Sequence, residues 1–229
     1  MATGKEVDEK IRKPITENVE LIFTQLEKFK LLIHQKGKAN QTLVRQFVRI
    51  WTDQDNLRTK TTILQNPETF KKYLDANAAF GLTEEIFMFD LMRHMASFYL
   101  SEIEMLKKIF RDMLDLKRLN LNPTATLGEM LEALSKRCGI NKQSMKQLFN
   151  VEFRDALAHD SWYFENRKFT YKTKGGKIEQ WTIDEFGGEL ISLSVLTEQI
   201  CLKYLKKFEP DKVSEAEKWI KEKTKPQEG

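Results

Sequence analysis

The chain has 229 residues and a formal net charge of +4, with 41% hydrophobic and 31% charged residues. This length fits one domain with an extension or two small domains, and the hydrophobic content suffices for a core, which excludes a disordered chain. The modest positive charge is compatible with a polyanionic partner but does not require one.

Two further features narrow the class of protein. No apolar run approaches the roughly 18 residues of a membrane span, and the N-terminal MATGKEVDEK lacks the apolar segment of a secretory signal. Cys138 and Cys201 have no metal-ligand spacing and are expected to be reduced core residues. We therefore expect a cytoplasmic protein with no membrane association and with no bound cofactor or metal.

Residues 1–80 are predicted to form a helical N-terminal region. An apolar stripe predicts a helix over 7–35 that ends at Gly37, with stripe positions Val19, Ile22, Phe23, Leu26, Phe29 and Ile33. A second helical segment at 41–51 precedes the polar TDQDNLRTKTT, a predicted loop. A short helix then starts at Pro67, is capped by Asn66, and runs to Leu74.

Residues 81–209 are predicted to form a bundle of about four helices. After Gly81, the helical period continues over 83–119 without a breaker. TLGEMLEAL begins with a capping box of Thr126 and Glu129, and its helix ends at Gly139. Asn141 caps the third helix, whose buried side carries Met145, Leu148, Phe149, Phe153, Ala156 and Leu157.

A small β-structure is predicted between the third helix and the last. SWYFENRKFTYKTKGGKIEQWTI alternates apolar and polar residues on both sides of Gly175 and Gly176, which indicates a β-hairpin or extended arm. Thr182 and Glu185 form a second capping box, and the last helix runs to about residue 208. The predicted fold class is all-α, with this hairpin inserted before the last helix and a charged, solvated tail over 210–229.

The stretch FRDALAHDSW, residues 153–162, contains the chemistry of most interest. Asp155 and His159 are four residues apart, so on a helix the carboxylate can accept a proton from one ring nitrogen and raise the basicity of the other. Arg154 lies about 140° around an ideal helix from His159, which does not align the two groups in one copy. Two copies facing each other across a dimer would align them.

A guanidinium and an imidazole can cleave an RNA phosphodiester without a metal. The 2′-hydroxyl attacks the adjacent phosphorus, a base takes its proton, an acid protonates the leaving 5′-oxygen, and a cation stabilises the charge on the non-bridging oxygens. The products are a 2′,3′-cyclic phosphate and a 5′-hydroxyl. The alternative is an ordinary helix end with surface ion pairs, which the spacing alone does not exclude.

The stretch and its surroundings resemble the R-x(4–6)-H motif of HEPN domains, in which a polar residue commonly follows the arginine. The resemblance covers about residues 81–208 and leaves the first 80 unexplained. It implies a four-helix bundle that dimerises with both motifs in a composite cleft, often a metal-independent ribonuclease in toxin, phage-defence or RNA-processing settings. It assigns Arg154 to the scissile phosphate, His159 to acid–base catalysis, and Asp155 to orienting or polarising His159.

The predicted hairpin and the long helix offer further candidates. Five cations in the hairpin are candidate RNA contacts or a solvated edge: Arg167, Lys168, Lys172, Lys174 and Lys177. The aromatics between them are expected to pack the hairpin onto the helices: Trp162, Tyr163, Phe164, Phe169, Tyr171 and Trp181. Asp90 and His94 form a second spaced pair, which we interpret as a surface pair, and a metal site of His94, His159 and Asp160 is disfavoured.

The leading functional prediction is therefore a homodimeric, metal-independent endoribonuclease that binds RNA, with an antitoxin or a nucleotidyltransferase as a further candidate partner. A second hypothesis is a non-catalytic module that binds RNA or nucleotides. A third is a helical interaction protein that holds a partner through its first 80 residues.

Overall fold

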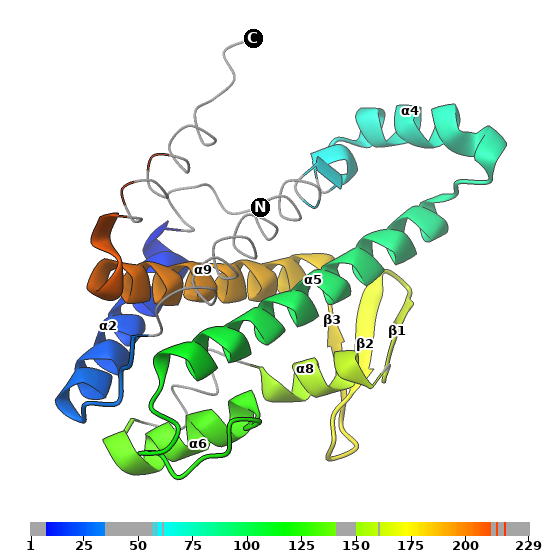
Figure 1. Cartoon of the computed structure of the whole chain (residues 1–229). Coiled ribbons are helices and arrows are strands. Elements are labelled where there is room, and N and C mark those ends of the chain that lie inside the picture. Colours follow the sequence, from blue (N-terminus) through cyan, green and yellow to red (C-terminus); the bar gives the residue numbers. More distant parts are fainter. Residues whose placement is uncertain are drawn as a thin grey trace.

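The computed structural model describes residues 8–34, 57, 59–60, 62–140, 150–159, 161–211, 214 and 218. In this part the chain is mostly helical and carries a small three-stranded antiparallel sheet (Figure 1). The helical elements are a π-helix η1 (Asp8–Arg12), α2 (Lys13–Lys28), α4 (Pro67–Asn77), a 3-10 turn η2 (Ala78–Phe80), α5 (Glu84–Met113), α6 (Leu127–Cys138), α8 (Val151–Ala158) and α9 (Ile183–Phe208). The strands are β1 (Trp162–Glu165), β2 (Lys168–Lys172) and β3 (Ile178–Trp181).

The two longest helices, α5 and α9, pack against each other and carry most of the core (Figure 1). The apolar side of α2 packs on α9, so the N-terminal region shares this core rather than forming one of its own. Two ion pairs join the N-terminal region to α9: Arg12 of η1 pairs with Glu198 at 2.9 Å, and Glu27 of α2 pairs with Lys207 at 2.7 Å. Burial of the apolar stripe provides most of the stability of such helices.

Two predicted helices are shorter than the periodicity suggested, and for a shared reason. Helix α2 ends at Lys28 and α5 at Met113, and the chain after α2 lies beside the end of α5. The amide of Ile33 donates to the carbonyl of Met113 at 2.9 Å, and the amide of Asp115 donates to Leu31 at 2.8 Å. These hydrogen bonds between two segments of the chain replace the helical ones, so both helices stop although their apolar spacing continues.

The loop predicted at TDQDNLRTKTT is wrong for the residues that the structure describes there. Leu57, Thr59, Lys60 and Thr62 are helical. Leu57 is buried in the core and Lys60 pairs with Asp90, so tertiary contacts outweigh the polar composition of this segment. The helix predicted at 41–51 and its neighbour Gly37 lie outside the described residues.

The side-chain caps predicted at Asn66, Thr126 and Thr182 are confirmed, and the cap predicted at Asn141 lies outside the described residues. The Asn66 side chain accepts from Thr69, and capping boxes start α6 at Thr126 and α9 at Thr182. Gly139 ends α6 in the left-handed region at φ 65°. The helix of the motif has its own N-cap, Asn150, whose side chain accepts from the amide of Phe153 at 3.0 Å; residues 141–149 lie outside the described part.

The sheet has three strands in the order β1-β2-β3, so the single hairpin predicted is wrong. The hairpin that was not predicted joins β1 to β2 and turns at Asn166 and Arg167, which both adopt positive φ, 51° and 59°. This pair of left-handed residues matches the tight turn that suits twisted antiparallel strands, although only asparagine favours it intrinsically. The turn containing Gly176 (φ 83°) joins β2 to β3 as expected.

Two compositional expectations can be compared with the fold. Cys138 and Cys201 are buried and form no disulfide, as predicted. Among the described helices, none has the length and hydropathy of a membrane span.

Candidate functional site

Helix α8 carries the motif and is anchored by Phe153, which is fully buried. Its ring lies at the centre of an aromatic cluster, with centroid distances of 4.4 to 5.5 Å to Trp181, Tyr99, Phe186, Tyr171 and Phe169. The cluster joins α5, α8, α9 and the sheet. Most sheet aromatics therefore pack onto the helices as predicted, whereas Tyr163 is 52% exposed.

The guanidinium of Arg154 lies between two carboxylates. Its Nη1 donates to Oδ1 of Asp155 at 2.7 Å, and its Nη2 lies 3.8 Å from Oε1 of Glu104 on α5. The Arg154 side chain is 37% exposed, so the group remains accessible to a ligand. The structure therefore places the predicted arginine and aspartate together, on the side of α8 that meets α5.

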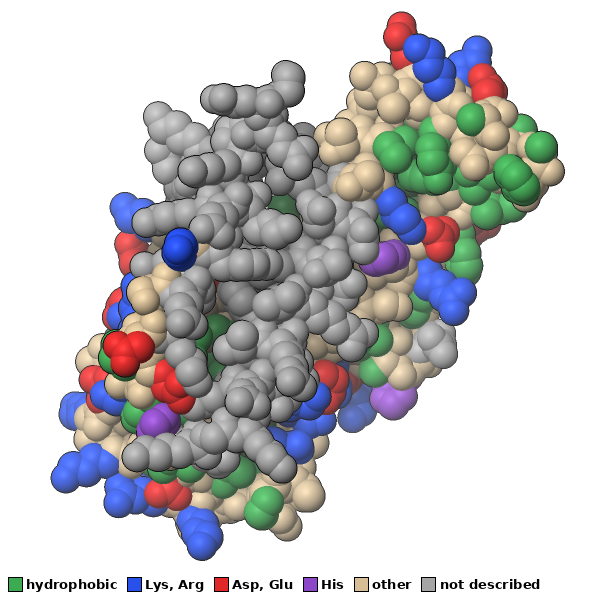
Figure 2. Space-filling model, turned by 45° about the horizontal axis from the view of Figure 1, so that its top comes forward, with side chains coloured by type: hydrophobic (Ala, Val, Ile, Leu, Met, Phe, Trp, Pro, Cys, Tyr) green, Lys and Arg blue, Asp and Glu red, His purple; other side chains and the backbone are tan. Residues whose placement is uncertain are grey.

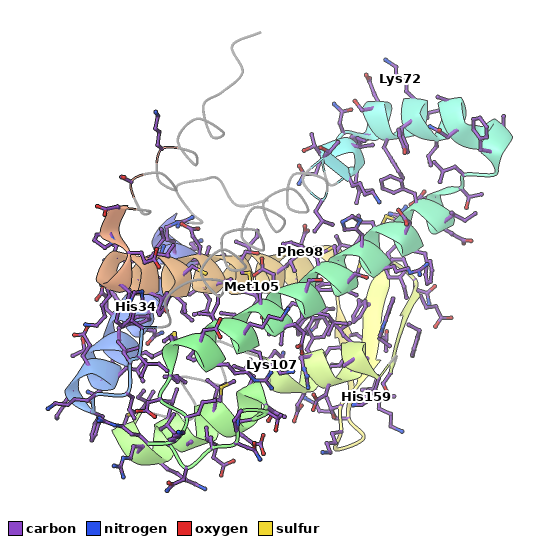
Figure 3. All side chains as sticks on the ribbon, viewed as in Figure 1. His34, Lys72, Phe98, Met105, Lys107 and His159 are labelled. Carbon is purple, nitrogen blue, oxygen red and sulfur yellow. The ribbon has the colours of Figure 1, made fainter. Side chains whose placement is uncertain are left out.

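His159 lies one residue beyond the last turn of α8, next to the sheet (Figure 3). Its amide donates to the carbonyl of Asp155 at 3.1 Å, but φ −109° and ψ 15° take the residue out of helical geometry. Its ring is exposed and forms no hydrogen bond or ion pair with any residue that the structure describes. The predicted contact between Asp155 and the imidazole is therefore not formed within one chain, because Asp155 binds Arg154 instead.

Sequence reasoning missed two residues of this site, Glu104 and Lys107. The ammonium of Lys107 lies 3.0 Å from Oε2 of Glu104 and 3.3 Å from Oε1, the oxygen that also faces Arg154. Figure 3 shows Lys107 on α5, beside α8. The i,i+3 spacing of Glu104 and Lys107 was visible in the sequence, but nothing there showed that this face of α5 meets α8.

The second Asp-His pair has no role at this site. Asp90 binds Lys60 at 2.6 Å rather than His94. Within the described ranges, no group of three or more potential metal ligands is assembled. Asp160, the third residue of the disfavoured metal site, lies outside those ranges.

The five cations of the sheet region fall into two groups. Arg167 pairs with Glu84 at the start of α5, and Lys177 pairs with Glu179. The three others, Lys168, Lys172 and Lys174, are exposed and form no ion pair with a described residue. Their charges are therefore available to a polyanion, whereas the first two are largely neutralised.

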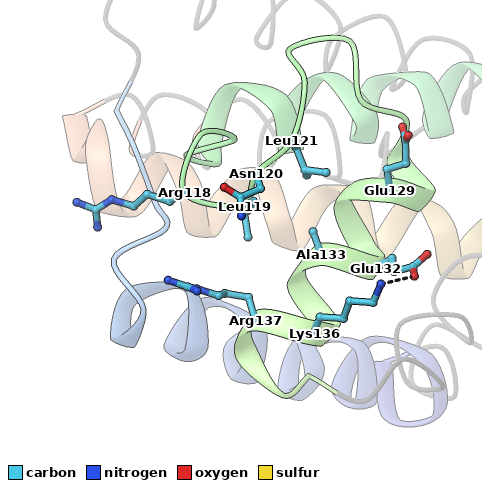
Figure 4. A pocket seen from close by; sticks show the side chains of 9 residues that line it. All are labelled: Arg118, Leu119, Asn120, Leu121, Glu129, Glu132, Ala133, Lys136 and Arg137. Atoms are coloured by element: carbon cyan, nitrogen blue, oxygen red, sulfur yellow. Dashed lines mark ion pairs between the residues drawn. The ribbon is translucent and has the colours of Figure 1, made fainter.

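A surface pocket of about 480 Å³ lies away from the motif, between residues 118–121 and α6 (Figure 4). Lys136 in it is bound to Glu132 at 2.8 Å, and Arg118 is bound to Asp115 at 3.2 Å. Two of the three cations that line the pocket are thus paired, and Glu129 and Glu132 also line it, so the pocket is not a predominantly cationic phosphate site.

Hydrophobic side chains gather at the protruding end of the molecule formed by α4 and the start of α5 (Figure 2). Phe80 is 87% exposed, Ile86 53% and Phe89 50%. Phe89 also stacks on Trp162 at 6.4 Å, which links this surface to the strand that follows His159.

Comparison with known proteins does not place the chain in a family: no family model, no curated protein and no solved structure matches it. The resemblance to HEPN domains therefore rests on the motif and on the order of the elements around it.

Proposed function

We propose that this protein is a metal-independent endoribonuclease of the HEPN type, active as a homodimer. The observation that carries the proposal is that Arg154 and Asp155 lie together, partly exposed, on the side of α8 that meets α5, with His159 at the end of the same well-anchored helix. Arg154 and His159 are both accessible to a ligand outside the chain.

In the proposed reaction, two copies of α8 face each other across a two-fold axis. One His159 takes the proton of the 2′-hydroxyl as it attacks phosphorus, and the partner's His159 gives a proton to the 5′-oxygen as the P–O5′ bond breaks. Arg154 binds the non-bridging oxygens and stabilises the charge that develops on them. The products are a 2′,3′-cyclic phosphate and a 5′-hydroxyl.

The test uses purified full-length protein and single-stranded RNA in EDTA. We expect new 5′-ends that polynucleotide kinase labels without prior phosphatase treatment, and we expect His159→Ala to abolish them. The histidine is exposed, so this variant should keep its circular dichroism spectrum. Full cleavage by folded His159→Ala would exclude the proposed catalytic role.

A non-catalytic module that binds RNA or nucleotides is the second candidate. It is favoured by the engagement of Asp155 with Arg154, which leaves the imidazole without a carboxylate partner in the described part of one chain. Wild-type protein that binds RNA through Arg154 without producing new ends would support this alternative.

A further inference from the structure

Two cationic groups, those of Arg154 and Lys107, approach one oxygen of the Glu104 carboxylate, and a phosphate site requires the same convergence of cations on an anionic oxygen. Oε1 of Glu104 lies 3.8 Å from Nη2 of Arg154 and 3.3 Å from Nζ of Lys107. The two cations come from different helices, α8 and α5, and approach the same anionic oxygen. An oxygen of a phosphodiester carries similar charge and accepts the same hydrogen bonds.

The two contacts of Arg154 differ in strength. The 2.7 Å contact to Asp155 is a short, charge-assisted hydrogen bond, whereas the 3.8 Å contact to Glu104 is too long for a hydrogen bond. Asp155 therefore holds one nitrogen of the guanidinium, and the Nη2 protons remain to be bound. A phosphate oxygen could approach Nη2 to about 2.8 Å, which Glu104 does not do here.

We propose that Arg154 and Lys107 form a two-cation site for a phosphodiester group of RNA, and that the carboxylate of Glu104 occupies this site in the free chain. Glu104 then acts as an internal competitor, which RNA must displace from both cations. The assignment rests on the proposed function in one respect, namely that Arg154 contacts RNA phosphate.

The exposure of the three side chains agrees with a displaceable contact. Glu104 is 48% exposed and Arg154 is 37% exposed, so the carboxylate can turn towards solvent while a phosphate takes its place beside the two cations. Lys107 is 21% exposed, and this burial limits the conformational freedom that its side chain loses on binding phosphate. Removing the charge of Glu104 should therefore strengthen anion binding with little effect on the fold.

The experiment measures the affinity of a fluorescent single-stranded RNA by anisotropy, at low salt and in EDTA. All variants carry His159→Ala so that the RNA remains intact. We expect Glu104→Gln to bind about fivefold more tightly, because a like charge about 4 Å from the phosphate is removed. We expect Lys107→Gln to weaken binding by a similar factor.

Glu132→Gln is the matched control. Glu132 pairs with Lys136 on α6 as Glu104 does with Lys107, and its substitution changes the net charge by the same amount away from the motif. We expect it to change the affinity less than twofold. The gain from Glu104→Gln should also disappear when Arg154→Gln is added.

Three outcomes overturn the proposal: Glu104→Gln and Glu132→Gln binding alike, a gain that persists without Arg154, or no measurable binding by Glu104→Gln. A cleavage assay with protein that retains His159 distinguishes failure of the competitor role of Glu104 from failure of the proposed ribonuclease function. If cleavage depends on Arg154 and His159 but Glu104→Gln has no effect, only the competitor role is lost. If no cleavage occurs but the gain is seen, the phosphate site stands and the ribonuclease activity does not.

Discussion

Glu102 on α5 and Ser194 on α9 are joined in the interior by a hydrogen bond of 2.9 Å from the serine hydroxyl to Oε1. Glu102 has no exposed surface, and its other oxygen, Oε2, has no hydrogen-bond partner. Burial raises the pKa of Glu102 from its ordinary 4.5 to about 7, and the hydrogen bond from Ser194 only partly offsets this. The core between the two longest helices thus contains an acid that is neutral in mildly acidic solution.

This acid should make stability depend on pH. The folded chain retains the proton that the unfolded chain releases above pH 4.5, so the free energy of unfolding should fall as pH rises from 4.5 to 7 and level off above. A difference of about 2.5 pKa units corresponds to roughly 3 kcal/mol. Glu102→Gln keeps a neutral acceptor for Ser194 and should be more stable than wild type by about that amount at pH 8, with a difference under about 1 kcal/mol at pH 4.5.

Urea denaturation at several pH values checks this, with Glu132→Gln as an exposed control. A difference between wild type and Glu102→Gln that stays constant across this range would contradict the assignment. Cys201, the neighbouring thiol, does not interfere, because burial raises its pKa to about 12.

Phe153→Ala should be strongly destabilising. The side chain is fully buried and contacts five other rings, so its loss leaves a cavity that joins three helices and the sheet. We expect the free energy of unfolding to fall by about 3–5 kcal/mol in chemical denaturation. Phe89→Ala, at a ring that is 50% exposed, is the comparison and should cost far less.

Arg154→Lys should separate charge from geometry. Lysine keeps the positive charge but cannot bind Asp155 and a phosphate oxygen with one planar group. We expect RNA cleavage to fall by about 100-fold or more, while the melting temperature is unchanged, because the ion pair is partly exposed. Cleavage within a factor of three of wild type would show that the guanidinium is not needed.

The exposed lysines of the sheet region should contribute to the salt dependence of RNA affinity. Changing Lys168, Lys172 and Lys174 to Gln should lower RNA affinity and reduce the slope of log affinity against log salt by about 2 if each lysine contacts a phosphate. Lys177→Gln is the control, since Glu179 already neutralises that charge. An unchanged slope in the triple variant would identify these lysines as a solvated edge.

Replacing Arg167 by glycine in the turn between β1 and β2 should stabilise the protein. Arg167 adopts φ 59°, which costs an ordinary residue about 1 kcal/mol, and glycine is the residue that this turn favours. Arg167→Gly should raise the free energy of unfolding by up to about 1 kcal/mol, less what the exposed pair with Glu84 contributes. Measuring it in a Glu84→Gln background removes the pair from the comparison. A loss of stability there would show that the turn is not strained.

Local sequence signals were sufficient to predict the features that depend only on interactions between residues close together in the sequence. The capping boxes at Thr126 and Thr182, the Asn66 cap and the helix end at Gly139 each depend on residues within one helical turn, and all form as predicted. The apolar stripe of α2 likewise indicated most of its buried face, since Val19, Ile22, Phe23 and Leu26 are buried, whereas Phe29 is 37% exposed. The packing of most sheet aromatics also followed from their alternation.

Contacts between distant segments were decided only by the tertiary structure. The early ends of α2 and α5 come from backbone hydrogen bonds between Leu31, Ile33 and the end of α5, some 80 residues away along the chain. The additional strand, β1, depends on a turn at Asn166 and Arg167, and only the asparagine is a residue that favours the left-handed conformation. At the site, the sequence alone determined that an arginine, an aspartate and a histidine lie near one helix end. Only the packing of α8 on α5 decided that Asp155 holds Arg154 and that Glu104 faces it, because a side chain's partner depends on distances that spacing along one helix does not contain.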